Sequence, residues 1–190
     1  MIASDEMYEK LVYDSEFTAT ASISDDMFQR TITINGLSKA VAMTGWRFGY
    51  LATPNKELIS AMNKLQSQST SNICSITQHA AITGLDGSAD ADIEMMRKEF
   101  KKRRDLAVTL FNESDKLSVA KPDGAFYLFV NIKKVTNDSM QFAKDLLSQE
   151  GVAVIPGLGF GSEGYFRFSF ATDEATIKEG IKRIRNFCEN

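Results

Sequence analysis

Residues 90–111 constrain the fold of this chain most, because the segment contains neither glycine nor proline. Apolar residues recur through it at helical spacing: Ile93, Met96, Phe100, Ala107, Leu110 and Phe111. This stripe predicts one long helix over residues 88–113. We expect that helix to lead from one lobe of the protein into another. The domain boundary is therefore predicted near residue 87, with domains at 1–87 and 88–190.

The residues before this helix mix strand and helix patterns. The first residues are typical of the end of a strand, and residues 9–27 are typical of an irregular connecting segment. The elements expected after them are strands at 30–36 and 47–54 and helices at 55–69 and 73–85. Asn35 and Gly36 end the first of these strands and Pro54 ends the second, so Lys39 is expected on the loop between two strands.

The residues after the long helix predict a compact α+β unit. The expected elements are strands at 116–122, 125–132, 152–156 and 165–171 and helices at 139–150 and 173–187. Gly151 closes the first of these helices, and Asp173 is a typical N-cap for the second. No internal repeat or low-complexity tract interrupts the order.

Composition excludes several classes of function. The chain has 190 residues, 43% of them hydrophobic and 25% charged, as in soluble globular proteins. A net charge of -3 argues against nucleic-acid binding, and the basic run 97–105 contains acidic residues at the spacing of a solvated helix face. Membrane spans and signal peptides have no counterpart in the sequence. Cys74 and Cys188 lie far apart and predict reduced thiols in the cytoplasm.

Two motifs look functional but are better read as structural. Residues 159–164 (GFGSEG) satisfy the glycine pattern of dinucleotide-binding loops, but a strand follows them where that fingerprint requires a helix. We expect a tight loop that presents the next strand. The single histidine, His79, lies within a predicted helix and is expected to be structural. No spacing in the sequence predicts a metal site.

Five other residues suggest one chemistry. Lys39 lies among small and apolar residues, and a desolvated lysine of lowered pKa can form an imine with an aldehyde. Arg47 begins a predicted strand and could hold a phosphate by its two-pronged guanidinium. Asp5 could hold a proton on a heterocyclic nitrogen if its carboxylate is buried. These three needs together describe pyridoxal phosphate (PLP), and Tyr8 and Arg167 are two further residues in unusual surroundings.

Four segments resemble the signatures of class I, fold-type I PLP-dependent aminotransferases, nearest the aspartate aminotransferase group. They are SDEMYEKLVYD, NGLSKAVAMTGWRFGY, PDGAFYLFVNI and PGLGFGSEGYFRFSFA, in chain order. The resemblance implies an α/β fold: the C-terminal part of the large PLP-binding domain, a partial sheet with helices, followed by a small α+β domain. It also implies a homodimer that moves an amino group between an amino acid and a 2-oxo acid.

The resemblance assigns a role to each of the five residues. Lys39 would form the imine with the cofactor and move the proton at the amino acid's α-carbon. Arg47 would bind the cofactor phosphate, Asp5 the ring nitrogen, and Tyr8 the ring oxygen O3′. Arg167 would bind the substrate carboxylate with two hydrogen bonds, which turns binding energy into orientation of the reacting bond.

The resemblance covers only the second half of the family's length. The other half would supply a phosphate loop, an aromatic ring stacked on the cofactor and much of the specificity pocket. The abrupt start predicts a fragment that is inactive alone and exposes sheet edges that favour self-association. Three alternatives stay open: a PLP-dependent β-lyase-like enzyme, a non-catalytic dimerisation or regulatory module, and a cofactor-free lysine enzyme. The last leaves Arg47 and Asp5 without a role.

Overall fold

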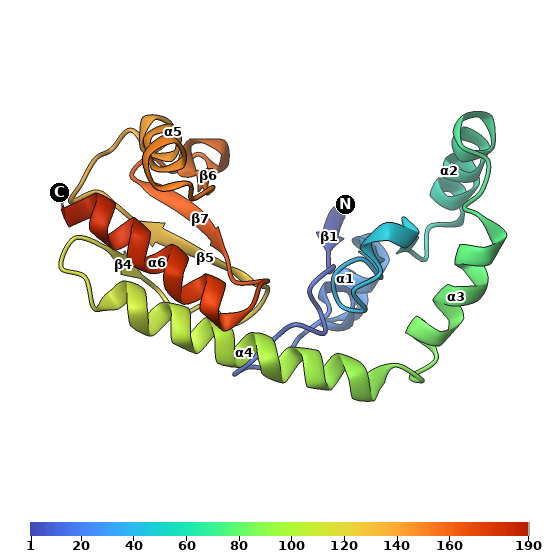
Figure 1. Ribbon diagram of the computed structural model, residues 1–190. Helices are drawn as coiled ribbons and strands as arrows, with labels where there is room; N and C mark the ends of the chain where they lie inside the picture. Colours follow the sequence, from blue (N-terminus) through green and yellow to red (C-terminus); the bar gives the residue numbers. More distant parts are fainter. Residues whose placement is uncertain (190) are drawn as a thin grey trace. The chain divides into compact units, whose positions relative to one another are not determined.

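The computed structural model describes residues 1–189, and the chain divides into two compact units (Figure 1). Unit 1 comprises Met1–Arg97 and unit 2 begins at Lys98. Helix α4 (Asp90–Asn112) runs through the division without a break, which confirms the long helix predicted over residues 88–113. The boundary predicted near residue 87 lies just before this helix.

Unit 1 is built on a three-stranded sheet in the order β1-β2-β3. Strand β1 pairs with β2 in parallel, and β2 pairs with β3 in antiparallel register. Its elements are β1 (Ile2–Asp5), the 3-10 turn η1 (Thr20–Ser22), α1 (Asp25–Arg30), β2 (Thr31–Gly36), η2 (Thr44–Trp46), β3 (Gly49–Ala52), α2 (Lys56–Ser69), α3 (Ser75–Leu85) and the first part of α4.

Two sequence-based expectations for unit 1 are wrong in detail. Residues 9–27 are not wholly irregular, because helix α1 begins at Asp25, where the Ser24 hydroxyl accepts a hydrogen bond from Met27 N. The strand expected from residue 47 begins at Gly49, because Arg47 adopts a left-handed conformation at the end of η2. Both differences come from local capping that apolar periodicity does not reveal.

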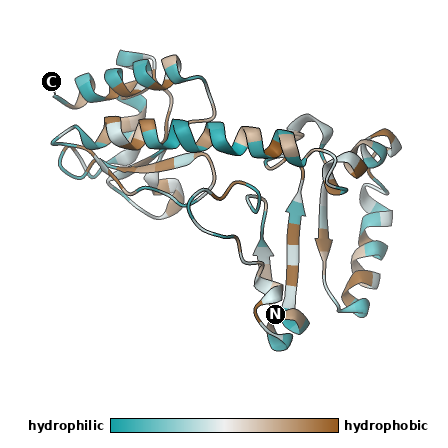
Figure 2. Ribbon diagram, turned by 90° about the horizontal axis from the view of Figure 1, so that it is seen from below, coloured by the Kyte–Doolittle hydropathy of each residue, from teal (hydrophilic) through white to brown (hydrophobic). Residues whose placement is uncertain are grey.

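Unit 1 leaves much apolar surface exposed. All four residues of β3 are exposed, and α2 contains no buried residue although its apolar side is spaced as predicted. Leu65 on α2 is 73% exposed. Figure 2 shows hydrophobic residues along β2 and β3. Parallel strands are usually covered by other elements on both faces of their sheet. The exposed apolar residues of unit 1 therefore give a physical reason for the predicted self-association of this chain.

Unit 2 is an α+β fold around a four-stranded antiparallel sheet in the order β4-β5-β7-β6. Its elements are the second part of α4, β4 (Ser118–Val119), β5 (Tyr127–Asn131), α5 (Ser139–Glu150), β6 (Ile155–Pro156), the 3-10 turn η3 (Gly157–Phe160), β7 (Tyr165–Ser169) and α6 (Glu174–Glu189). The mixed α/β fold predicted from the sequence is thereby confirmed.

The core of unit 2 lies on one face of its sheet. Phe166 of β7 is fully buried and contacts Phe111 of α4 and Phe142 of α5 through its ring. Helix α6 adds its predicted apolar stripe, of which Ile177 and Ile184 are fully buried. Alternation along a strand places Arg167 on the opposite face from Phe166. That face carries the substrate-binding candidate.

Helix caps in unit 2 follow the sequence closely. The Asp138 side chain accepts from Gln141 N at the start of α5, and Gly151 ends that helix in a left-handed conformation. Asp173 accepts from Thr176 N at the start of α6, as predicted. The strand expected over 152–156 is shorter, because only Ile155 and Pro156 pair with β7.

The two free cysteines are predicted to differ in reactivity. Cys74 is exposed, whereas Cys188 is buried on α6. Burial raises the pKa of the Cys188 thiol to about 11, so the thiol stays protonated near neutral pH and only the rare thiolate can react. We expect iodoacetamide at pH 8 to label Cys74 fast and Cys188 slowly, with equal labelling in denaturant. Mass spectrometry checks this, and equal native rates would contradict the described packing of α6.

Candidate active site

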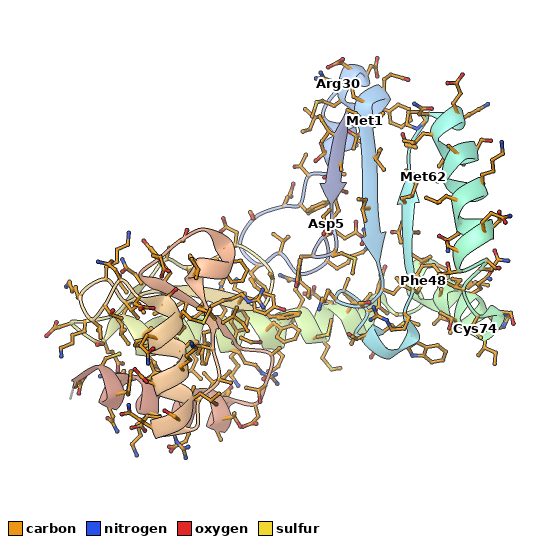
Figure 3. All side chains as sticks on the ribbon, turned by 90° about the horizontal axis from the view of Figure 1, so that it is seen from above. Met1, Asp5, Arg30, Phe48, Met62 and Cys74 are labelled. Carbon is orange, nitrogen blue, oxygen red and sulfur yellow. The ribbon has the colours of Figure 1, made fainter. Side chains whose placement is uncertain are left out.

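The strand pairing of unit 1 brings the predicted site residues to one end of its sheet. Asp5 ends β1 and pairs with Ile34 of the parallel strand β2, so the chain leaves both strands at the same edge. Gly36 pairs with Gly49 at the start of β3, which places Arg47 there as well. Figure 3 shows Asp5 and Phe48 at the end of the sheet opposite to Met1 and Arg30.

Lys39 lies in the tight turn that follows β2, as expected. Its carbonyl accepts from Ala42 N at 3.3 Å, and Met43 N donates to the carbonyl of Leu37 at 3.0 Å. Close packing sets the start of the turn, because a Cβ at Gly36 would lie 2.8 Å from the carbonyl oxygen of Phe48. The glycine therefore lets β2 and the start of β3 approach each other beside the lysine.

Arg47 is tied to the same turn by local hydrogen bonds. Its Nη1 donates to the carbonyl of Thr44 at 3.1 Å, and the Thr44 hydroxyl donates to the carbonyl of Ser38 at 2.8 Å. Arg47 itself has φ 55°, a left-handed conformation that a residue with a Cβ rarely adopts. Such strain persists where the surrounding structure holds it and is frequent at functional sites.

The residues after β1 form a second hydrogen-bonded turn at this edge. Asp5 Oδ1 accepts from Met7 N at 3.2 Å, and Leu11 N donates to the carbonyl of Tyr8 at 2.8 Å. Glu6 between them is buried, and its carboxylate accepts from Ser4 Oγ at 2.9 Å and from Thr20 N at 3.0 Å. Glu6 thus anchors the turn that presents Asp5 and Tyr8.

Unit 1 by itself does not form the desolvated pocket that the sequence suggests for Lys39, nor does it bury Asp5. Asp5 and Arg47 are exposed, and Lys39 is half-buried. The physical reason is that unit 1 supplies these groups from turns at one end of a sheet and does not itself enclose them. The turns that carry these groups lie at the same end of the sheet, and Asp5 and Arg47 are accessible to water.

A hollow of about 380 Å³ lies next to the Lys39 turn within unit 1. Gly36, Ala40 and Tyr50 line it, together with Glu9 and Asp90 among others. Burial, and then the carboxylates of Glu9 and Glu6, raise the pKa of Tyr50, so its phenol stays protonated near neutral pH. Lys39, Asp5, Tyr8 and Arg47 are not among the residues that line this hollow, so it is not the predicted site.

Arg167 belongs to unit 2 and lies on the uncovered face of its sheet. It pairs with Phe129 of β5 and with Ile155 of β6, and it lines a hollow of about 470 Å³. Its Cζ lies 4.3 Å from the ring centroid of Tyr127 and 5.0 Å from that of Phe160. Within residues 98–189 its guanidinium makes no hydrogen bond or ion pair, so its donors are available to a carboxylate.

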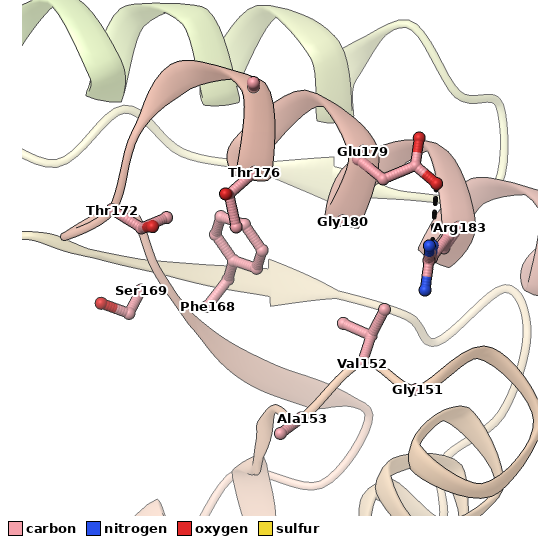
Figure 4. A pocket seen from close by; sticks show the side chains of 11 residues that line it. Gly151, Val152, Ala153, Phe168, Ser169, Thr172, Thr176, Glu179, Gly180 and Arg183 are labelled. Atoms are coloured by element: carbon pink, nitrogen blue, oxygen red, sulfur yellow. Dashed lines mark hydrogen bonds and ion pairs between the residues drawn. The ribbon is translucent and has the colours of Figure 1, made fainter.

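Other candidates gain no support. A hollow of about 550 Å³ between α6 and residues 151–153 contains none of the predicted residues (Figure 4), and its Arg183 pairs with Glu179 at 2.8 Å. His79 is exposed on α3. Among residues 1–189, no cluster of three or more His, Cys, Asp or Glu is arranged to hold a metal. No described helix combines the length and hydropathy of a membrane span.

The sequence reasoning missed three residues that shape the site. Glu6 was not distinguished from the surface acids, because its burial depends on Ser4 and Thr20. Tyr127 could have been found from strand alternation in YLFVN, which puts it on the face of Phe129 and Arg167. Phe160 carries no such signal, because its ring reaches Arg167 from a turn of irregular register.

Comparison with known families identifies the class. The model of the family "Aminotransferase class I and II" matches residues 1–184, nearly the whole chain. This chain belongs to that family. The match covers the segments that carry Asp5, Tyr8, Lys39, Arg47 and Arg167.

Individual relatives show how far the likeness extends. The aspartate/prephenate aminotransferase of Cereibacter sphaeroides (strain ATCC 17029 / ATH 2.4.9) is 45% identical over 98% of this chain and 49% of that protein. The asparagine–oxo-acid transaminase of Streptococcus mutans serotype c is 44% identical over 100% of this chain and 49% of its own length. The chain thus spans about half the length of the curated relatives it matches.

Solved structures give the same proportion. The aspartate aminotransferase from Rhizobium meliloti matches with a TM-score of 0.93 and 41% identity, over 98% of this chain and 49% of that one. The aromatic aminotransferase from Pyrococcus horikoshii OT3 matches with a TM-score of 0.93 and 38% identity, over 100% of this chain and 51% of that one. The fold-class prediction is confirmed by both.

Proposed function

We propose that the protein to which this chain belongs transfers an amino group between an amino acid and a 2-oxo acid with the help of PLP. The observation that carries the proposal is the strand pairing of unit 1. Parallel β1 and β2 and antiparallel β3 gather Asp5, Tyr8, Lys39 and Arg47 at one end of a sheet. Arg167 is available in unit 2, where its guanidinium donors are not used by any of residues 98–189.

The chemistry of these groups fits PLP. An amine can bond to its aldehyde carbon, a guanidinium can bind its phosphate, a carboxylate can pair with its ring nitrogen, and a phenol can donate to its ring oxygen. When bound, PLP supplies a ring that withdraws electrons from the amino acid's α-carbon. Gly36 lets the carbonyl oxygen of Phe48 and the sulfur of Met7 approach the strand end that leads into the lysine turn.

Each residue of the chain has a stated task in this proposal. Lys39 Nζ would take the proton from the amino acid's α-carbon and deliver it to C4′ of the cofactor. Arg47 would hold the phosphate, and the hydrogen bond from its Nη1 to the carbonyl of Thr44 ties the guanidinium to the turn that carries Lys39. Asp5 keeps the ring nitrogen protonated, and Tyr8 donates to O3′. Arg167 binds the α-carboxylate by two parallel hydrogen bonds and orients the reacting C–H bond.

The amino-acid substrate is proposed only as a class, with aspartate as the first to test. The names of the relatives differ: aspartate and prephenate, asparagine, and aromatic amino acids. The predicted homodimer and cytoplasmic location belong to the same proposal and rest on the family resemblance. The β-lyase-like alternative shares the lysine and the cofactor and differs in its products.

A chimera tests the proposal. It joins residues 1–190 to the part of the Rhizobium meliloti aspartate aminotransferase that this chain does not cover. We expect a visible absorbance band when PLP is added, and turnover of aspartate that requires a 2-oxo acid. Release of ammonia without a 2-oxo acid would support the β-lyase-like alternative instead. A folded chimera that shows neither would contradict both enzymatic proposals.

The 190-residue chain alone is expected to be inactive and to stay colourless at micromolar PLP. Its described residues offer one guanidinium to the phosphate in an exposed setting, and each charge-assisted hydrogen bond contributes only about 1.5–3 kcal/mol. Borohydride reduction at millimolar PLP followed by mass spectrometry gives a second measurement. Lys39 should be labelled ahead of the exposed Lys56, and equal labelling would argue against a built site.

A further inference from the structure

The surroundings of Arg167 point to residues that act on the arginine itself. An arginine side chain has many rotamers, so immobilising it when a ligand binds lowers affinity. Tyr127 and Phe160 both lie within cation–π distance of its Cζ, at 4.3 Å and 5.0 Å. An aromatic ring attracts a guanidinium without occupying its N–H donors in ordinary hydrogen bonds. The two N–H groups of Arg167 that would bind a carboxylate side by side therefore stay available.

The exposure of Phe160 argues against a role in the core. Its side chain is 47% exposed, and the ring contacts described for it are to Arg167 and to Phe129. A phenylalanine that buried its ring for stability would lie on the other face of the sheet, with Phe166. The position of Phe160 is instead explained by its contact with the cation.

The segment from Gly157 to Gly164, called here the glycine loop, fixes Phe160 in place. A Cβ at Gly157 would lie 2.1 Å from the carbonyl oxygen of Ser162, so only glycine fits at the start of η3. Leu158 N donates to the hydroxyl of Ser139, which is fully buried at the start of α5. Gly161 then ends the turn in a left-handed conformation. Within the motif of residues 159–164, Gly161 (φ 71°) and Gly164 (φ 75°) adopt left-handed conformations that favour glycine, so the loop geometry explains them without a bound nucleotide.

We propose that Tyr127 and Phe160 form an aromatic clamp, a pair of positioning residues that hold the guanidinium of Arg167 ready for a carboxylate. The proposal rests on the role of Arg167 in the proposed function. Tyr127 approaches from strand β5 and Phe160 from the glycine loop, so two separate elements fix one cation. Loss of the Tyr127 or Phe160 ring should make the Arg167 side chain more mobile while its positive charge stays unchanged.

The first test reads the arginine directly by NMR of the 190-residue chain. Arg167→Lys identifies the Nε–Hε signal of Arg167, which ring currents should shift to lower frequency. Tyr127→Leu and Phe160→Leu should each move this signal back toward the position of a free arginine. Phe160→Tyr, which keeps the ring, should preserve it, as should the control Phe187→Leu, whose ring packs on Phe142. An unmoved signal in both leucine variants would overturn the clamp.

The second test measures carboxylate binding by titrating propionate and following the same signal. Phe160→Leu should weaken propionate binding by about three- to tenfold, the factor for immobilising one long side chain. Phe160→Tyr and Phe187→Leu should bind as the unchanged chain does. Equal affinity for Phe160→Leu would overturn the positioning role. Both tests run without PLP, so a failure of the proposed function at Lys39 would show separately in the borohydride experiment.

Discussion

Lys39→Ala in the chimera should abolish transamination while the protein stays folded. The lysine provides both the amine that bonds to the cofactor and the base at the substrate's α-carbon. A general base alone contributes about 10²–10⁴-fold, so kcat/KM should fall by at least about 10³-fold. Stopped-flow or steady-state assays with aspartate and a 2-oxo acid measure it. The visible absorbance band should disappear with the activity.

A matched lysine makes this result specific. Lys56 is exposed at the start of α2, in the same unit as Lys39 but away from the sheet edge that carries the site. Lys56→Ala should retain activity within about twofold, since surface substitutions rarely disturb a fold. Circular dichroism of both variants should be unchanged. A Lys39→Ala chimera that keeps a tenth of the original turnover would show that another group is the base.

Arg167→Lys in the chimera should raise KM for the amino acid by about 10- to 100-fold and leave PLP binding intact. A lysine keeps the charge but cannot make two parallel hydrogen bonds to a carboxylate. Losing one charge-assisted bond of about 1.5–3 kcal/mol accounts for a change of that size. The absorbance band of the cofactor should be unchanged, because Arg167 belongs to unit 2 and the PLP-binding candidates to unit 1.

Arg183→Lys is the control for this second change. Arg183 lies on α6, pairs with Glu179 and donates to the carbonyl of Glu150, and it lines a different hollow from Arg167. Its substitution should leave KM within about twofold, because exposed ion pairs contribute little. If Arg167→Lys binds aspartate as tightly as the unchanged chimera, the carboxylate role assigned to Arg167 is wrong.

Exposure of the site residues is the main difference between the inferred chemistry and the described structure. The catalytic proposal needs a lysine shielded from water, yet Asp5 and Arg47 are exposed. Unit 1 also exposes all of β3 and most of α2. The relatives have about as many residues again beyond the part matched here. For this reason the activity is proposed for the whole protein and tested in the chimera.

Sequence alone determined the features that local interactions specify. The apolar stripe of α4, the Asp173 cap and the Gly151 stop depend on residues a few positions apart, so the helices of unit 2 were predicted nearly to the residue. The family motifs identified the candidate site residues, because a motif is also a local pattern of sequence. These residues are Asp5, Tyr8, Lys39, Arg47 and Arg167. Their roles were implied by the resemblance and remain proposals.

Only the tertiary structure decided which distant segments meet. The parallel pairing of β1 with β2 joins strands separated by α1 and its connections, and it alone puts Asp5 at the same edge as Lys39. The contact of Phe160 with Arg167 depends on a turn anchored to Ser139 on another helix. Sequence periodicity reports which face of a segment is apolar. Periodicity does not show which distant segments a given segment packs against, because long-range pairing is selected by burial over the whole unit.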